Sequence, residues 1–178
     1  MFNDSKNKPL EVPYYSQYLD IVEPFWMPRA CGMCCFKMIL DFHKKETPSL
    51  IKMCEEGKEN GGYGKSGWIH DYFVKKGKEY GLSVEREEKM DEDGGIQKIK
   101  NALDKGEPVI VSIAKRSLGR SYFHMIVLTG YEEDLGFVRG FYYHEPESLS
   151  REEGEHRFVE LKDFMYDWRR MAIFFRPA

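Results

Sequence analysis

The sequence predicts an α+β domain in which helices precede an antiparallel meander of strands. Three observations support this fold class. Apolar residues recur at helical spacing between residues 31 and 42. The β-branched run Val109–Ile113 is typical of a buried strand, and two further strand-like segments, 123–131 and 137–144, follow it around a short turn. Because the helical segments come first, we expect the helices to pack on one side of the sheet.

Caps, periodicity and turn residues place the remaining elements along the chain. Its length of 178 residues fits a single domain, 1–178, with residues 1–10 as a loosely ordered lead-in. Residues 11–15 should form a short strand or an extended arm. Further helices are expected at 48–55 (capped by Thr47 or Ser49), from the cap Ser66 to Gly81, from Ile96 to Gly106, and at 162–168. Short strands are expected at 82–85, 158–160 and 171–175, and loops at 60–64, 85–93, 114–122 and 145–157.

The first helix carries three of the four cysteines of the chain. Cys31, Cys34 and Cys35 fall at positions i, i+3 and i+4 of one apolar stripe. Pro28 just ahead of the stripe indicates that the helix begins near Cys31, so this cysteine lies at a helix N-terminus. Unpaired N–H groups and the helix macrodipole favour a thiolate there. Cys34 and Cys35 lie one turn further along and are expected to be buried, as free cysteines commonly are.

The composition argues against several classes of function. A net charge of −3 gives no basic excess to neutralise phosphates, so we expect no binding to nucleic acid. The apolar runs are far shorter than the ~20 residues of a membrane helix, so we expect no membrane segment. The first ten residues are polar and lack the apolar core of a signal peptide. As given, the chain is expected to be cytoplasmic, while a secreted or lipoprotein location stays open if a leader was removed.

The cysteine spacing offers one metal-binding alternative. Cys31, Cys34 and Cys54 could supply three zinc ligands, with His43 or His70 as a fourth. Structural zinc pairs usually lie on a turn, however, and the chain has no second closely spaced pair. We therefore expect no metal and no cofactor. Adjacent cysteines on a helix also do not predict a disulfide.

A reactive cysteine needs a base, and His124 differs from the other four histidines. It opens a strand whose following residues, Met125–Leu128, are wholly apolar, whereas His43, His70 and His156 are expected to be structural or at the surface. A lone histidine at a strand start is more often a core group than a catalyst. A carboxylate paired with His124 would favour the catalytic interpretation.

The expected hairpin provides such a carboxylate. If the turn is centred between Asp134 and Leu135, His124 lies directly opposite Glu145, and cross-strand Cβ atoms are ~5 Å apart. The carboxylate could then accept the imidazole N–H and leave the other ring nitrogen for a thiol proton. A register slipped by one residue would place a neighbour of Glu145 there and turn the side chains to the opposite face.

Four short segments of the chain are, in order, Ser16-Gln17, Ala30-Cys31-Gly32, His124–Tyr131 and Glu145-Pro146. Together they resemble the C39-like cysteine peptidases of the papain-like superfamily. The similarity spans roughly residues 12–175. It implies a papain-like cysteine proteinase fold, in which a nucleophile-bearing helix packs on an antiparallel sheet.

The resemblance also implies catalytic roles. It assigns Cys31 as the nucleophile, His124 as general base and acid, and Glu145 as the carboxylate that orients the imidazole. Gln17 would donate its side-chain amide to the oxyanion, together with the backbone N–H of Cys31. Two positions depart from the family. The acid before the proline is more often Asp than Glu, and Ala30 stands where an acidic or polar residue is usual.

These residues predict a thiol-dependent hydrolase that acts on a peptide or amide bond of a peptide or protein substrate. Tyr14, Tyr15, Trp26 and Tyr122 are candidates to line the cleft, with an ordinary place in the core as the alternative. Neither the substrate nor the oligomeric state follows from the sequence.

Three other functions stay open. The first is a papain-like acyltransferase or transglutaminase, in which an amine replaces water. The second is a non-catalytic C39-like module that binds peptides, although the joint presence of cysteine, histidine, carboxylate and glutamine argues against it. The third is a thiol redox or metal sensor built on Cys31, Cys34 and Cys35.

Overall fold

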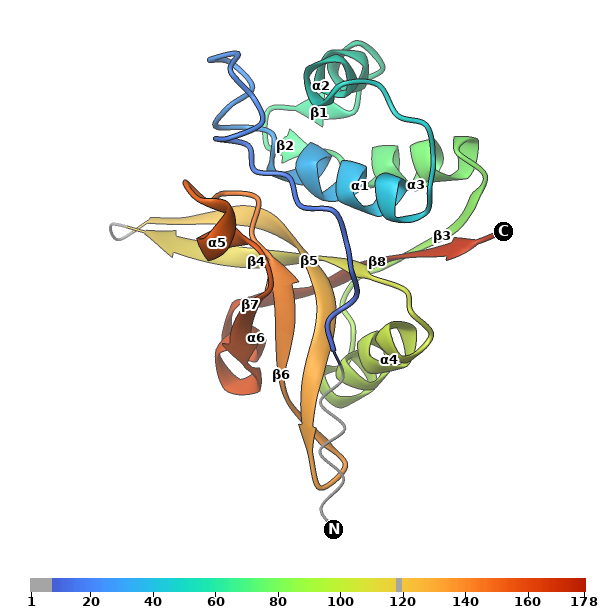
Figure 1. Ribbon diagram of the computed structural model, residues 1–178, viewed down its shortest axis with the longest axis vertical. Coiled ribbons are helices and arrows are strands. Elements are labelled where there is room, and N and C mark those ends of the chain that lie inside the picture. The colour runs from blue at the N-terminus through green and yellow to red at the C-terminus, as the bar shows by residue number, and fades with distance from the viewer. Residues whose placement is uncertain (1–7, 118–119) are drawn as a thin grey trace.

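The computed structural model describes residues 8–117 and 120–178, and within them it contains six helices and eight strands (Figure 1). The helices are α1 (Cys31–Phe42), α2 (Leu50–Glu59), α3 (His70–Glu79), α4 (Glu92–Asp104), α5 (Arg151–Gly154) and α6 (Leu161–Asp167). The strands are β1 (Tyr63–Gly64), β2 (Gly67–Trp68), β3 (Leu82–Glu87), β4 (Val109–Ser117), β5 (Arg120–Asp134), β6 (Phe137–His144), β7 (Arg157–Glu160) and β8 (Trp168–Pro177). None of the described helices has the length and hydropathy to cross a bilayer.

Six strands form one antiparallel sheet in the order β3-β8-β4-β5-β6-β7, while β1 and β2 form a separate small hairpin. The run from β4 to β7 is the expected meander. The last strand of the chain, β8, lies between β3 and β4, so it is internal to the sheet. The architecture is therefore α+β, with the N-terminal helix α1 packed on an antiparallel sheet.

Helices cover both faces of this sheet, and the expectation that they pack on one side is wrong. On one face, Ile110 and Met125 belong to the core beneath α1, α2 and α3. On the other face, Val111 and Ile126 belong to a second core with α4 and α6 (Figure 1). The inner strands are apolar at successive positions, and a strand of this kind must be covered on both sides.

The starts of α1 and α2 agree with the sequence, whereas α4 begins at Glu92, capped by Asp91, and not at Ile96 as expected. The first helix begins at Cys31, as expected, and the hydroxyl of the expected cap Ser49 accepts the N–H of Lys52 at the start of α2. The third helix was expected from Ser66 but begins at His70. The reason is that Trp68 pairs with Tyr63 in the β1–β2 hairpin, in a region expected to be loop and helix.

Residues 114–122, expected to be a loop, are mostly strand. The strand β4 continues to Ser117, β5 begins at Arg120, and Lys115 pairs with Tyr122. The expected loop residue Gly119 lies outside the described residues. Polar side chains interrupt the apolar pattern in this segment, so hydrophobicity did not reveal the extension of the two strands.

Residues 8–15 form an extended arm rather than a strand of the sheet. The backbone N–H of Leu10 donates to the carbonyl of Thr129 on β5 at 2.7 Å. Further along the arm, the carbonyl of Val12 accepts Nε2–H of His144 at 2.8 Å. The arm therefore runs across β5 and β6 and leads the chain to residues 16–17.

Candidate active site

Cys31 is the first residue of α1 and is partly exposed, whereas the five residues that directly follow it are buried. Gly32 allows a close approach to β5, because a Cβ there would come within 3.0 Å of side-chain atoms of Met125 and Trp68. Cys35, one turn along, donates its S–H to the carbonyl of Met125 at 3.3 Å. These contacts fix the start of α1 beside the strand position that carries His124.

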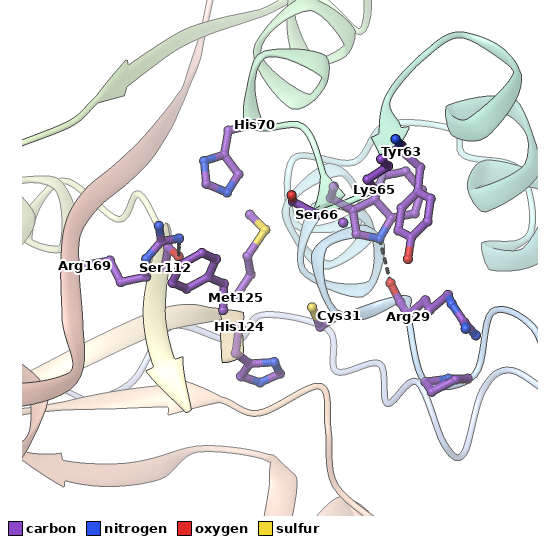
Figure 2. Close-up of a pocket in the computed structure, with 14 residues that line it drawn as sticks. Arg29, Cys31, Tyr63, Lys65, Ser66, His70, Ser112, His124, Met125 and Arg169 are labelled. Atoms are coloured by element: carbon purple, nitrogen blue, oxygen red, sulfur yellow. Dashed lines mark hydrogen bonds between the residues drawn. The ribbon is translucent and has the colours of Figure 1, made fainter. Parts of the chain in front are cut away.

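His124 is buried on β5, with 2 % of its surface exposed. Its Nε2 atom contacts Oε1 of Glu145, and the ring also shares a hydrogen bond with Cys31. Glu145 engages Nε2, and Oε2 of Glu147 lies 3.7 Å from the other ring nitrogen, Nδ1. Figure 2 shows Cys31 and His124 at the same end of a pocket, one from α1 and the other from the sheet. The structure thus brings Cys31, His124 and Glu145 together.

The surroundings of His124 favour its charged form. Burial alone would lower the pKa of the imidazole, because an apolar environment disfavours a cation. Hydrogen bonds with Cys31 and Glu145, and the charges of both groups, outweigh burial and raise the pKa to about 10. His124 is therefore an imidazolium at neutral pH. An imidazolium next to a cysteine is the arrangement that stabilises a reactive thiolate.

The carboxylate of Glu145 is buried among hydrogen-bond donors and positive charge. The backbone N–H of Glu147 donates to Oε1 at 2.8 Å, and Nζ of Lys115 lies 3.4 Å from Oε2. Burial would raise the pKa of this carboxyl group. The hydrogen bond and charge of His124, with smaller effects from Lys115 and the N–H of Glu147, instead lower the pKa to about 2. Glu145 is therefore ionised at neutral pH.

The backbone of Glu145 is also held in place. Its carbonyl accepts the hydroxyl of Tyr14 at 2.7 Å, and its N–H donates to the carbonyl of Gly154 at 2.8 Å. Position 154 has no room for a side chain, because a Cβ there would lie 1.7 Å from the Tyr14 hydroxyl oxygen. Tyr14 and α5 together fix the point from which the carboxylate extends.

His124 and Glu145 are in contact as expected, but the expected strand register is wrong. The turn consists of residues 135–136, both with positive φ, so the pairing is shifted by two residues from the expected one at both ends of the hairpin, and by three between Gly130 and Glu132, where the ladder is irregular. The strand β6 ends at His144, opposite Val127, and Glu145 lies just beyond its end. A shift of two residues keeps the side chains on the same face, which is why the contact still forms.

Gln17 lies against the acid–proline segment. Its backbone N–H donates to the carbonyl of Pro146 at 2.8 Å, and the neighbouring hydroxyl of Ser16 donates to the carbonyl of Ser148 at 2.6 Å. The side-chain oxygen of Gln17 is buried and has no hydrogen-bond partner among the described residues. Buried polar atoms are nearly always paired, so this oxygen is available to accept a hydrogen bond from a ligand.

The four aromatic residues expected to line the cleft lie outside the lining of this pocket. Tyr14 and Trp26 are buried in the core, so a cleft-lining role does not apply to them. Tyr15 donates its hydroxyl to an aspartate of α1. Tyr122 is 38 % exposed, with its ring centroid 6.4 Å from that of His124, and its hydroxyl donates to Glu147.

The pocket is a cavity of about 530 Å³ that opens beside Cys31 and His124 (Figure 2). The start of α1 and the β1–β2 hairpin form one wall, and β4, β5 and β8 form the other. The sequence analysis did not identify the following lining residues: Arg29, Lys65, Ser66, His70, Ser112, Phe123 and Arg169. No motif marks them, because they are far apart in the chain and meet only when the hairpin and β8 are in place.

One group among the described residues brings metal-ligating atoms within 4.8 Å of one another: His144, Glu155 and His156. The imidazole of His144 is already engaged at both nitrogens. It donates from Nε2 to the carbonyl of Val12 and accepts the backbone N–H of His156 at Nδ1. Burial lowers the pKa of His144 to about 4, so the ring is neutral. This group therefore joins the N-terminal arm to β6.

The cysteines that a zinc or redox site would need, other than Cys31, are buried thiols. Burial raises the pKa of Cys34 and Cys35 well above the ordinary value. It raises the pKa of Cys54 to about 12. All three therefore keep their protons at neutral pH, whereas a metal ligand must be a thiolate.

The model of the Peptidase_C39 like family matches residues 9–172. Solved structures with the same fold include a double glycine motif protease from an AMS/PCAT transporter in complex with the leader peptide. It is 19% identical, with a TM-score of 0.63 over 97% of this chain and 96% of that one. A putative C39-like peptidase from Bacillus anthracis is 16% identical, with a TM-score of 0.66 over 97% of this chain and 99% of that one.

The peptidase domain of Streptococcus ComA, a bi-functional ABC transporter involved in a quorum sensing pathway, is similar as well. It is 18% identical, with a TM-score of 0.60 over 85% of this chain and 93% of that one. No curated protein sequence matches the chain. At these identities the solved structures establish the fold, and the family match covers nearly the whole chain.

Replacing Gly154 with alanine should destabilise the protein. The new methyl group would overlap the Tyr14 hydroxyl and disturb both hydrogen bonds that hold the Glu145 backbone. We expect the free energy of unfolding, measured in urea, to fall by about 1–3 kcal/mol, as for other overpacked sites. Gly64→Ala is the matched control, because its methyl group would meet only Ile69, at 3.7 Å. Equal stability of the two variants would contradict this account.

The pKa values of Glu145 and His124 should make stability depend on pH. Glu145, whose pKa is lowered from 4.5 to about 2, stabilises the fold above pH 4.5 and loses this effect as the pH falls toward 2. His124, whose pKa is raised from 6.5 to about 10, stabilises the fold below pH 6.5 and loses this effect as the pH rises toward 10.

The wild-type protein should therefore exceed Glu145→Gln in unfolding free energy most clearly between pH 4.5 and 6.5. Urea titrations at a series of pH values measure this difference in unfolding free energy, which should become smaller both below and above this pH range. The exposed variant Glu152→Gln serves as the control and should follow the wild type. A difference between wild type and Glu145→Gln that stays constant with pH would show that the two groups are not coupled in this way.

Proposed function

The chain belongs to the Peptidase_C39-like family, and we propose that it is a cysteine peptidase with Cys31, His124 and Glu145 as its catalytic triad. The observation that supports this most directly is the buried imidazole of His124, held between Cys31 and Glu145 beside an open cavity. A neutral structural histidine would not need both a sulfur and a carboxylate at its two ring nitrogens. This pairing is the arrangement that nucleophilic catalysis by cysteine requires.

In the first half of the proposed reaction, the Cys31 thiolate attacks the carbonyl carbon of a peptide bond. The carbonyl oxygen becomes an oxyanion, which accepts hydrogen bonds from the backbone N–H of Cys31 and the side-chain amide of Gln17. The His124 imidazolium then donates its Nδ1 proton to the amide nitrogen of the substrate. The C–N bond breaks, the amine product leaves, and the acyl group remains on the sulfur as a thioester.

In the second half, the roles of His124 are reversed. The imidazole, now neutral, takes a proton from water, and the water oxygen attacks the thioester carbonyl. Collapse of the second oxyanion breaks the C–S bond and releases the carboxylic acid product. The Cys31 thiolate and the His124 imidazolium are restored, so proton transfers balance over the cycle.

Glu145 acts on His124 rather than on the substrate in this proposal. Its low pKa keeps it ionised, so it accepts Nε2–H and fixes the ring with Nδ1 toward Cys31. Lys115 and the N–H of Glu147 hold the carboxylate in turn. The double glycine motif protease was solved with a leader peptide bound, and we propose that the cavity of this chain also takes a peptide.

Reaction with iodoacetamide tests whether Cys31 is activated. We expect one cysteine, Cys31, to be alkylated fast at pH 6, because the imidazolium of His124 stabilises its thiolate, while the three buried thiols react slowly. His124→Ala should suppress the fast reaction, and His43→Ala should not. Peptide mapping by mass spectrometry identifies the labelled residue. Equal, slow labelling of all cysteines in the wild-type protein would rule out an activated nucleophile.

Steady-state kinetics on a cleaved peptide test the role of Gln17. Loss of an oxyanion donor lowers kcat by about 10²–10³-fold, so Gln17→Ala should show such a decrease with little change in KM. Cys31→Ala should have no measurable turnover. Gln97→Ala, on α4 at the opposite face of the sheet, is the matched control and should behave as the wild type. An unchanged kcat in Gln17→Ala would remove Gln17 from the proposed mechanism.

A further inference from the structure

The cavity beside Cys31 is lined by basic side chains and by no acidic one. Arg29, Lys65, His70 and Arg169 are among its lining residues, and its described lining contains no Asp or Glu. This contrasts with the whole chain, which has 30 acidic residues and a net charge of −3. The positive charge is therefore concentrated at the place where, in the proposed function, a substrate binds.

Arg169 is held in a defined position by its neighbours. Its guanidinium lies 3.3 Å from the ring centroid of Phe123, and Nη1 donates to Oγ of Ser112 at 3.1 Å. Phe123 precedes His124 in the chain, and Ser112 is on the adjacent strand β4. The stacked guanidinium therefore comes from β8 but is fixed beside the proposed general base, with donors left over for an incoming ligand.

No carboxylate within the described residues forms an ion pair with Arg169. Glu88 exerts a favourable charge effect on it, but the carboxylate of Glu88 pairs with Arg86 at 3.3 Å. Ser112 supplies only a neutral oxygen. A stacked, positioned arginine without an acidic partner is suited to bind a carboxylate, since guanidinium and carboxylate form paired, charge-assisted hydrogen bonds.

The opposite wall repeats this pattern. Lys65 lies in the β1–β2 turn, and Arg29 lies two residues before Cys31, where its Nη1 donates to the carbonyl of Phe25. In the described parts of the chain, neither side chain forms an ion pair. Figure 2 places Arg169 on one side of Cys31 and Arg29 with Lys65 on the other. The guanidinium of Arg29 extends away from Cys31 in Figure 2, so Arg169 is the positioned cation that a peptide in this cavity would meet.

We propose that this cavity selects peptides with a carboxylate close to the bond that is cleaved, and that Arg169 is the main determinant of this specificity. The inference rests on the proposed peptidase function and names its class of substrate. The carboxylate could belong to an Asp or Glu side chain or to the free C-terminus of the substrate. Both present the same group to the guanidinium, and the experiment separates them.

The first experiment uses two mixtures of diverse synthetic peptides, one amidated at the C-terminus and one with free C-termini. The wild-type protein is incubated with each mixture, and the cleaved bonds are identified by mass spectrometry. We expect Asp and Glu to be enriched at one fixed position near the cleaved bond in the amidated mixture. Cleavage confined to the ends of the free peptides would instead assign the terminal carboxylate as the recognised group. Absence of both patterns overturns the proposal.

The second experiment measures the contribution of Arg169 with two peptides that differ only by Glu or Gln at the position identified in the first experiment. If the terminal carboxylate is the recognised group, the two peptides differ instead by a free or an amidated C-terminus. We expect kcat/KM to be about tenfold higher for the carboxylate peptide, which corresponds to about 1.4 kcal/mol. This ratio should decrease with added salt. It should fall toward one in Arg169→Gln and be partly kept in Arg169→Lys. For side-chain recognition, Arg169→Glu should favour a peptide with Lys there.

A matched control and a parallel measurement separate the possible failures. Arg139→Gln, an exposed arginine of β6 outside the cavity lining, should leave the ratio unchanged. If Cys31 is alkylated fast and peptides are cleaved, but the ratio is the same in Arg169→Gln as in the wild type, the specificity inference is overturned and the proposed function stands. If no peptide is cleaved and Cys31 is not activated, both are overturned.

Discussion

The contact between His124 and Glu145 is the constraint on which the rest of this structure depends. An imidazolium and a carboxylate are both buried, and each would be strongly destabilising without the other. The carboxylate of Glu145 has further partners: Lys115 lies near one of its oxygens, and the backbone N–H of Glu147 donates to the other. The arm and α5 hold the Glu145 backbone through Tyr14 and Gly154. Segments distant in the chain therefore converge on a single ion pair.

Cys31 has to meet this pair from the other side, and small residues make that approach possible. Gly32 brings the start of α1 within van der Waals distance of β5, and the thiol of Cys35 forms a hydrogen bond to that strand. The cysteine-rich stripe thus has two separate uses. Its first residue remains partly exposed at the cavity, while the buried ones attach the helix to the sheet. Their high pKa values keep these buried thiols protonated and unreactive.

The sequence predicted the elements with clear periodicity and missed those defined by long-range pairing. The start of α1 at Cys31 and the cap Ser49 follow from local signals, and both are found. The insertion of β8 between β3 and β4 has no local signal, and Arg169 enters the cavity only because of it. The predicted hairpin register was wrong because the turn was predicted one residue too early in the chain; the observed turn consists of residues 135–136. The predicted contact of His124 with Glu145 is nevertheless found, because a shift of two residues leaves both side chains on the same face of the sheet.

The same register brings two carboxylates close to His124. Glu145 lies beyond the end of β6, whereas the observed pairing extended by three residues would place Glu147 opposite His124. Oε2 of Glu147 is in fact 3.7 Å from Nδ1, but its carboxylate also accepts the Tyr122 hydroxyl and pairs with Lys115. Glu145, two residues earlier in the chain, contacts Nε2 instead. In the proposed mechanism this arrangement matters, because a carboxylate on Nε2 leaves Nδ1 available to exchange a proton with Cys31 and the substrate.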